Sequence, residues 1–234
     1  MFRKYDLIIN HNKRCSDYHI YISDRANIPV SKMEYEDINI IGRHGTLTKE
    51  HGYLDKEIKV SFNFFDPLSM PKLIRHINTL FTDVKEIMFT DDDEVYYRVK
   101  KVTLGDVERQ IRHYGFFDVS FTVEPFSYDS RVYPLEITNN NYRLMNPASY
   151  YSLPKITIYG TGDITLTINN TITKFNNVDD YITVDSEILE TYKDEILQND
   201  KKVGEFFTFD TGENVISWNG NVQKIVIEPR WRWL

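Results

Sequence analysis

The sequence predicts a mainly β protein with one helix, divided into two domains. Most apolar residues lie in short segments that alternate with polar residues, which is the period of a strand with one buried face. A single segment has helical spacing instead. Tyrosine (16 residues) and phenylalanine (14 residues) are abundant. Aromatic side chains favour half-buried sheet surfaces and protein interfaces, so the excess supports sheets and assembly.

The composition narrows the classes of function. The 234 residues are enough for two modest domains, and 41% hydrophobic with 27% charged residues is typical of globular proteins. The formal net charge of −7 argues against general phosphate binding, so no nucleic-acid binding is predicted. The single cysteine, Cys15, cannot form an internal disulfide. The apolar run 7–9 is too short for a signal peptide or a membrane span, which predicts a protein made in the cytoplasm.

Four alternating segments in the first half predict strands, at 18–22, 57–64, 95–99 and 115–123. Pro125 ends the last of these strands, because proline has no N–H to donate to a ladder. The acidic run 91–94 lies between two strand patterns and predicts a hairpin turn. A calcium loop of the EF-hand type needs alternating ligands and a central glycine, which this run lacks.

One amphipathic helix is predicted at about 68–81. The apolar residues of one face follow helical spacing: Leu73, Ile77, Leu80 and Phe81. Ser69 is a suitable N-cap, and Pro71 fits the first turn. We expect this helix to pack on the sheet of the first domain.

The second half predicts roughly seven short strands with regular turns, which is typical of a β-sandwich. Its clearest strand segments are 155–159, 164–168, 181–184, 206–209, 215–218 and 224–229. Turns are predicted between them at 160–163, 210–214 and 219–221. A polar break at 138–141 precedes these strands, and we place the domain boundary near 135. The predicted domains are therefore 1–134 and 135–234.

No catalytic, metal or cofactor site is predicted. The six histidines lack metal-ligand spacing, and the carboxylates at 179–180 and 185–187 show no recognisable catalytic arrangement. The glycines of GRHGTL at 42–47 lack the ending of a phosphate-binding loop. We interpret them as a loop that requires positive φ angles or a close backbone approach. The sequence thus predicts a protein that is not an enzyme.

Aromatic doublets supply the candidate interface residues. Tyr96 with Tyr97, and Phe116 with Phe117, lie in predicted strands, so one ring of each pair must face away from its own core. The C-terminal sequence WRWL holds two further aromatic rings, those of Trp231 and Trp233. These two rings have two interpretations, closure of the second domain's core or contact with another protein.

Several motifs, taken in order, resemble the distal tail protein family of long-tailed bacteriophages. In the first half, GRHGTL at 42–47 resembles a characteristic turn, and FTVEPFSY at 121–128 resembles the segment that closes the N-terminal domain. In the second half, the similar segments are LPKITIYG at 153–160, ITVDSE at 182–187 and GENVISW at 212–218. The resemblance spans nearly the whole chain.

This resemblance implies a structural subunit of a phage tail tip or baseplate, made in the bacterial cytoplasm and located in the virion. The family's N-terminal domain forms a six-membered ring, and its C-terminal domain is a galectin-like β-sandwich. The ring is expected to link the tail tube protein to a tail-associated fibre or lysin protein, and in some cases to a receptor-binding protein. An alternative function is a carbohydrate-binding module for host adhesion, although the galectin-type sugar signature is missing. A cell-wall enzyme is the weakest alternative.

Overall fold

The computed structural model describes residues 5–65, 70–111, 114–131 and 133–234. The chain divides into two compact units, of which the first ends at Ser130 and the second spans Arg131–Trp233. Strands dominate both units, and a single α-helix, α1 (Met70–Phe81), occurs in the described part of the chain. The predicted fold class, mainly β with one helix, is therefore confirmed.

The first unit is built on an antiparallel sheet with the strand order β2-β1-β7-β8-β10-β6-β3. Its neighbouring strands β6 and β10 pair along their whole length, from Tyr114 opposite Phe65 to Val123 opposite Lys56. Further strands extend the sheet, since β9 pairs with β10 and β11 pairs with β8. The strands of this unit are β1 (Leu7–Ile9), β2 (Lys13–Arg14), β3 (Ile20–Ile22), β6 (Lys56–Phe65), β7 (Glu86–Phe89), β8 (Asp92–Leu104), β9 (Glu108–Ile111), β10 (Tyr114–Val123) and β11 (Ser127–Asp129).

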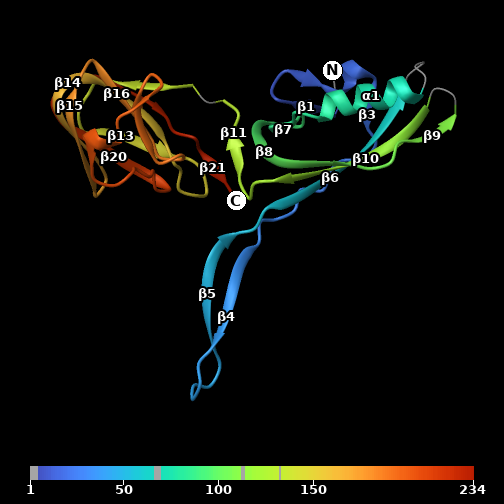
Figure 1. Cartoon of the computed structure of the whole chain (residues 1–234), viewed down its shortest axis with the longest axis horizontal. Helices are drawn as coiled ribbons and strands as arrows, with labels where there is room; N and C mark the ends of the chain where they lie inside the picture. The colour runs from blue at the N-terminus through green and yellow to red at the C-terminus, as the bar shows by residue number, and fades with distance from the viewer. Residues whose placement is uncertain (1–4, 66–69, 112–113, 132) are drawn as a thin grey trace. The chain divides into compact units, whose positions relative to one another are not determined.

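Helix α1 lies along one face of this sheet (Figure 1). The four apolar residues predicted for its inner face, Leu73, Ile77, Leu80 and Phe81, are all buried. The ring of Phe81 packs at 5.7 Å from that of Phe62 and at 6.1 Å from that of Phe117. The predicted start at Leu68 and the predicted cap at Ser69 lie outside the described residues.

The predicted bounds of two elements in the first unit need correction. The predicted strand 18–22 is shortened to Ile20–Ile22, because Cys15–Tyr18 forms a 3-10 turn that ends at a left-handed His19 (φ 59°). The predicted turn at 91–94 lies slightly earlier in the chain, because Phe89 already pairs with Asp92 as β8 begins.

A long hairpin projects from the sheet of the first unit (Figure 1). It consists of β4 (Met33–Asn39) and β5 (Thr46–Tyr53), which form a separate two-stranded sheet. We call Met33–Tyr53 the arm. Its turn contains Gly42 (φ 84°) and Gly45 (φ 78°), which confirms that this loop needs two glycines with positive φ.

The second unit is a curled antiparallel sheet around its own core, in agreement with the predicted galectin-like β-sandwich. Its main strand order is β12-β20-β14-β16-β17-β18, while β13 pairs with β20, and β15 pairs with β14 and β19. The fully buried rings of Phe175, Phe207 and Phe209 lie at its centre. The strands are β12 (Leu135–Ile137), β13 (Tyr142–Asn146), β14 (Lys155–Ile168), β15 (Thr171–Val178), β16 (Tyr181–Asp185), β17 (Glu190–Lys193), β18 (Ile196–Leu197), β19 (Lys202–Val203), β20 (Gly212–Glu228) and β21 (Arg232–Trp233).

Two predicted turns of the second unit are wrong. The segments 160–163 and 219–221 do not reverse the chain, because each lies inside one continuous strand, β14 or β20. These two long strands pair with each other, and their register shifts at these segments. Gly160 and Gly220 permit close backbone approach instead. A Cβ on Gly160 would lie 2.2 Å from the backbone oxygen of Asn221, and one on Gly220 would lie 2.5 Å from that of Asp163.

The predicted strand at 206–209 is also wrong. This segment forms one isolated bridge, between Ser152 and Phe209, rather than a ladder. The alternating apolar residues that predicted the strand serve the core, since Phe207 and Phe209 are fully buried.

The contact between α1 and the sheet gives a test of stability. Phe81→Ala should lower the free energy of unfolding by about 3–5 kcal/mol, because it removes a buried ring and leaves a cavity beside Phe62 and Phe117. The matched control is Ile74→Ala on the exposed side of α1, with an expected change of about 0.5 kcal/mol. Urea unfolding followed by fluorescence measures both. Equal effects of the two substitutions would contradict the described orientation of the helix.

Candidate assembly surfaces

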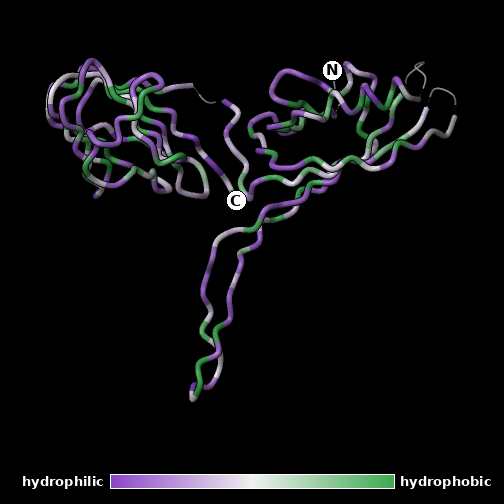
Figure 2. The backbone as a smooth tube through the Cα atoms, in the orientation of Figure 1, coloured by the Kyte–Doolittle hydropathy of each residue, from purple (hydrophilic) through white to green (hydrophobic). Residues whose placement is uncertain are grey.

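The arm is exposed to water along nearly its whole length. Ile41 at its turn is fully exposed, and Ile40, Tyr35 and Leu47 are also exposed large apolar residues. Figure 2 shows this apolar character near the far end of the arm. Water-exposed apolar residues on a sheet with open edges are typical of a surface that another protein covers.

Contacts within the arm hold its two strands in register. The imidazole Nε2 of His51 lies 2.8 Å from a carboxylate oxygen of Glu36, and the hydroxyl of Thr48 donates to Asp37 at 2.9 Å. At its base, the N–H of Leu54 donates to the carbonyl of Lys32 at 2.8 Å. A two-stranded hairpin has no core of its own and is marginally stable in water. The arm therefore gains most from a surface that packs against it.

The aromatic doublets divide as strand alternation requires. Tyr97 and Phe117 are 8% and 1% exposed and belong to the core of the first unit. Tyr96 and Phe116 are half-buried and lie on the opposite face. The ring of Tyr96 stacks on that of Tyr128 at 5.6 Å. Core packing accounts for Tyr97 and Phe117, and a role in subunit contact stays a prediction for Tyr96 and Phe116.

The two C-terminal tryptophans also differ from each other. Trp231 is buried, and its ring lies 5.7 Å from that of Phe209. Trp233 is half-buried and packs beside the same core. The sequence left two interpretations open for these rings. Trp231 packs in the core of the second unit, and contact with another subunit stays a prediction for Trp233.

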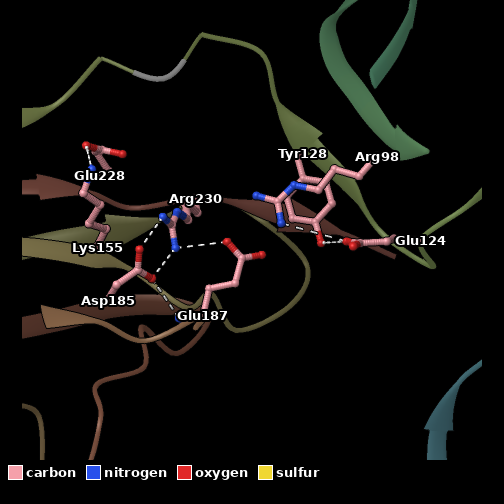
Figure 3. A network of polar contacts seen from close by, with 8 residues as sticks. All are labelled: Arg98, Glu124, Tyr128, Lys155, Asp185, Glu187, Glu228 and Arg230. Atoms are coloured by element: carbon pink, nitrogen blue, oxygen red, sulfur yellow. Dashed lines mark hydrogen bonds and ion pairs between the residues drawn. The ribbon is translucent and has the colours of Figure 1, made fainter. Parts of the chain in front are cut away.

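A cluster of ion pairs around the buried Asp185 lies near the end of the second unit (Figure 3). The guanidinium of Arg230 donates to both carboxylate oxygens of Asp185, at 2.6 and 2.8 Å, and lies 3.0 Å from Glu187. Arg230 has a left-handed backbone (φ 53°), an unusual state for a residue other than glycine. The bidentate pair holds this bend, which directs the following residues toward the core.

The ion cluster changes the acidity of Asp185. Burial opposes ionisation of this carboxyl group, but the hydrogen bonds and charge of Arg230, with the backbone N–H groups of Glu187 and Ile188, outweigh it. The pKa of Asp185 is therefore lower than its ordinary value. The cluster stays charged throughout the neutral range.

Another polar cluster in Figure 3 belongs to the first unit. The hydroxyl of Tyr128 donates to a carboxylate oxygen of Glu124, and the guanidinium of Arg98 lies 4.0 Å from the centroid of the Tyr128 ring. These contacts join β8, β11 and the segment after β10. They explain why the sequence FTVEPFSY combines a carboxylate with an aromatic ring four residues later.

A row of aromatic and charged side chains crosses one face of the second unit. The rings of Tyr159 and Tyr181 lie 5.5 Å apart. The ammonium groups of Lys224 and Lys193 lie over them, at 5.1 and 5.2 Å from the respective centroids. Sugar binding to tyrosine requires an open ring face, whereas each of these rings is already covered by a neighbouring ring and a lysine. The row stabilises the sheet through cross-strand contacts.

Among the described residues, no group of three or more histidine, cysteine, aspartate or glutamate side chains could hold a metal ion. Within the same residues, no helix is both long enough and apolar enough to cross a membrane.

Comparison with known proteins gives one clear result. Neither a protein-family model nor a curated protein sequence matches this chain. Solved structures do match. The Dit protein (gp 19.1) of phage SPP1, described as a paradigm of the hub adsorption apparatus in phages that infect Gram-positive bacteria, aligns with a TM-score of 0.71 and 13% identity, over 99% of this chain and 100% of that one.

A chain of the phage P2 baseplate, in its activated conformation with calcium, aligns with a TM-score of 0.51 and 9% identity over 97% of each chain. The chain thus has the fold of a phage tail hub protein. More particularly, it has the fold of the distal tail protein Dit along its entire length, which confirms the resemblance found in the sequence.

The ion cluster of the second unit gives a pH-dependent prediction. Asp185→Asn should lower the free energy of unfolding by about 1–3 kcal/mol at neutral pH, because Arg230 loses its bidentate charged partner. The pKa of Asp185 is lower in the folded than in the unfolded chain, so its stabilisation is present above the unfolded value of about 3.9 and is lost as pH falls below it.

Thermal unfolding at a series of pH values checks this prediction. The melting temperatures of the wild type and Asp185→Asn should differ at neutral pH and converge in acid. Glu187→Gln serves as the control, because it changes a more exposed carboxylate beside Arg230 and should cost less. A constant difference down to about pH 3 would show that the Asp185 carboxylate is not the source of the stabilisation.

Proposed function

We propose that this chain is a structural subunit of a phage tail tip, where six copies form a hub ring. In this role the ring links the tail tube protein to a tail-associated fibre or lysin protein, and it provides attachment for the receptor-binding apparatus. The observation that carries the proposal is the agreement with the SPP1 hub protein over the full length of both chains. The ordered sequence motifs of both halves support the same role.

The arm supports the ring in particular. A closed ring needs two different surfaces on each subunit, one that reaches out and one that receives. The arm is an outward-reaching element with open strand edges, and its large apolar residues face solvent on their own copy. We propose that each arm packs on the next subunit, so that its exposed side chains become buried when the ring closes.

The polar clusters support a structural rather than an enzymatic role. The buried carboxylate of Asp185 is neutralised by Arg230 and keeps a low pKa, which suits a fixed ion pair rather than a proton donor. The Glu124 carboxylate likewise accepts a hydrogen bond from Tyr128 within the fold. We propose that these groups hold the scaffold rigid, and that the protein acts by binding its neighbours.

Oligomeric mass tests the proposal directly. Light scattering after size exclusion should give six times the chain mass of 27.8 kDa, and negative-stain images of the same peak should show rings. The closing interface is expected to involve the arm, so assembly should depend on the arm's length.

The matched variant shortens the arm without changing its turn. Removal of residues 36–39 and 46–49 deletes four paired rows and keeps Tyr35 opposite Glu50. It shortens the arm by roughly 14 Å and preserves the facing of the remaining side chains. We expect a folded monomer. A wild-type chain that stays monomeric at every concentration would contradict the ring, and a ring from the shortened variant would contradict the role of the arm.

A further inference from the structure

An open stretch of sheet edge lies in a hollow of the first unit. We propose that this edge, residues 57–61 of β6, binds an extended basic segment of another protein as an added strand. The basic side chains of that segment face Asp24 and Glu57. This inference goes beyond the proposed ring and does not depend on its closure.

The edge of β6 is only partly paired. β3 pairs with β6 as far as Phe62, and the contact ends where the N–H of Ser23 donates to the carbonyl of Ser61 at 2.8 Å. The chain then leaves the ladder over residues 24–31. It returns at Lys32, whose carbonyl accepts a main-chain hydrogen bond at the base of the arm. Between these two contacts, no strand of the described chain lies beside β6 on this side.

The main-chain groups of this edge point toward the hollow. The carbonyl of Ser61 and the N–H of Phe65 both bond on the side where β3 lies. Residues two apart in a strand direct their main-chain groups to the same side, so those of Glu57 and Lys59 face this side as well. Within the described residues, these outward groups of Glu57 and Lys59 have no hydrogen-bond partner. A strand edge of this kind is a template for pairing with another chain.

The hollow gives an added strand a second wall. It has a volume of about 400 Å³, and residues 24–29 line the side opposite β6. On that side, Ile28 is 42% exposed and offers an apolar contact, and the carboxamide of Asn27 is exposed as well. Residues 57–61 span roughly 14 Å of strand, enough for a short extended segment. Such segments gain affinity from main-chain hydrogen bonds and specificity from alternate side chains.

The charges of the hollow select the occupant. Four charged residues line it: Asp24, Arg25, Glu57 and Lys59. Both cations already have partners, because Arg25 pairs with Asp91, and the Nζ of Lys59 lies 2.7 Å from a carboxylate oxygen of Asp118. The carboxylates of Asp24 and Glu57 are exposed and form no ion pair with the described chain. They favour a segment with lysine or arginine at alternate positions. The net charge of −7 makes a second copy the poorer occupant.

A short peptide tests the binding. The probe is Lys-Val-Lys-Val-Lys, blocked at both ends and labelled with fluorescein, and it is titrated with the full-length chain. Fluorescence anisotropy should show saturable binding, and Glu-Val-Glu-Val-Glu should bind roughly ten-fold more weakly. N-methylation of both valines removes main-chain donors and should weaken binding by a similar factor. No saturable binding of the basic peptide, or equal binding of the acidic one, would overturn the proposal.

A proline at residue 59 tests the role of the strand edge. Lys59→Pro removes one outward N–H, whereas the N–H groups of Ile58 and Val60 still bond to β10. The affinity for the basic peptide should fall roughly ten-fold. The matched control, Lys59→Ala, also loses the ammonium group but keeps the N–H, so it should bind at least as tightly as the wild type. Circular dichroism verifies that both variants fold, and equal affinities of the two would contradict strand addition.

Hydrogen exchange of the unsubstituted chain locates the contact without any variant. Saturating basic peptide should slow exchange of the outward amides of Glu57 and Lys59 by roughly ten-fold, because they become hydrogen-bonded. Slower exchange confined to other residues would reject this site. Protection of the same two amides that grows with protein concentration, in the absence of peptide, would identify a second copy as the occupant and overturn the basic partner.

Discussion

The full-length pairing of β6 with β10 is the interaction on which the first unit depends. Alternation along both strands places Phe62, Phe64, Phe117 and Phe121 on one face, where α1 covers them. The same ladder anchors the arm, because β5 ends at Tyr53 and β6 begins only three residues later. A solvent-exposed hairpin is thereby continuous with a strand whose inner face lies in the core of the unit.

Much of this architecture could be predicted from local patterns. Strand alternation at 57–64 and 115–123 and the inner face of α1 follow directly from sequence periodicity. The arm strand Met33–Asn39 escaped prediction because its residues face solvent on both sides, so no apolar alternation marks it. Hydrophobic periodicity reports burial. It therefore fails at an element whose side chains lie outside any core.

Glycine explains the errors in the second unit. The same residue type signals a tight turn and a place where two backbones nearly touch, and only the paired strand distinguishes these cases. Gly160 and Gly220 face backbone atoms more than fifty residues away in the sequence, which no local pattern records. The ion pair of Asp185 with Arg230, residues 45 positions apart, is hidden for the same reason. Contacts of this kind determine how the long strands bend.

The exposure of the arm has an evolutionary consequence. Side chains such as Tyr35, Ile41 and Leu47 contribute little to the packing of their own subunit, so substitutions there leave the hydrophobic core intact. The buried residues of α1 and β10 have no such freedom, because they pack in the core. Two surfaces that bind one another can therefore diverge together while the scaffold is conserved, which lets related proteins acquire mutually incompatible partners without any change of fold.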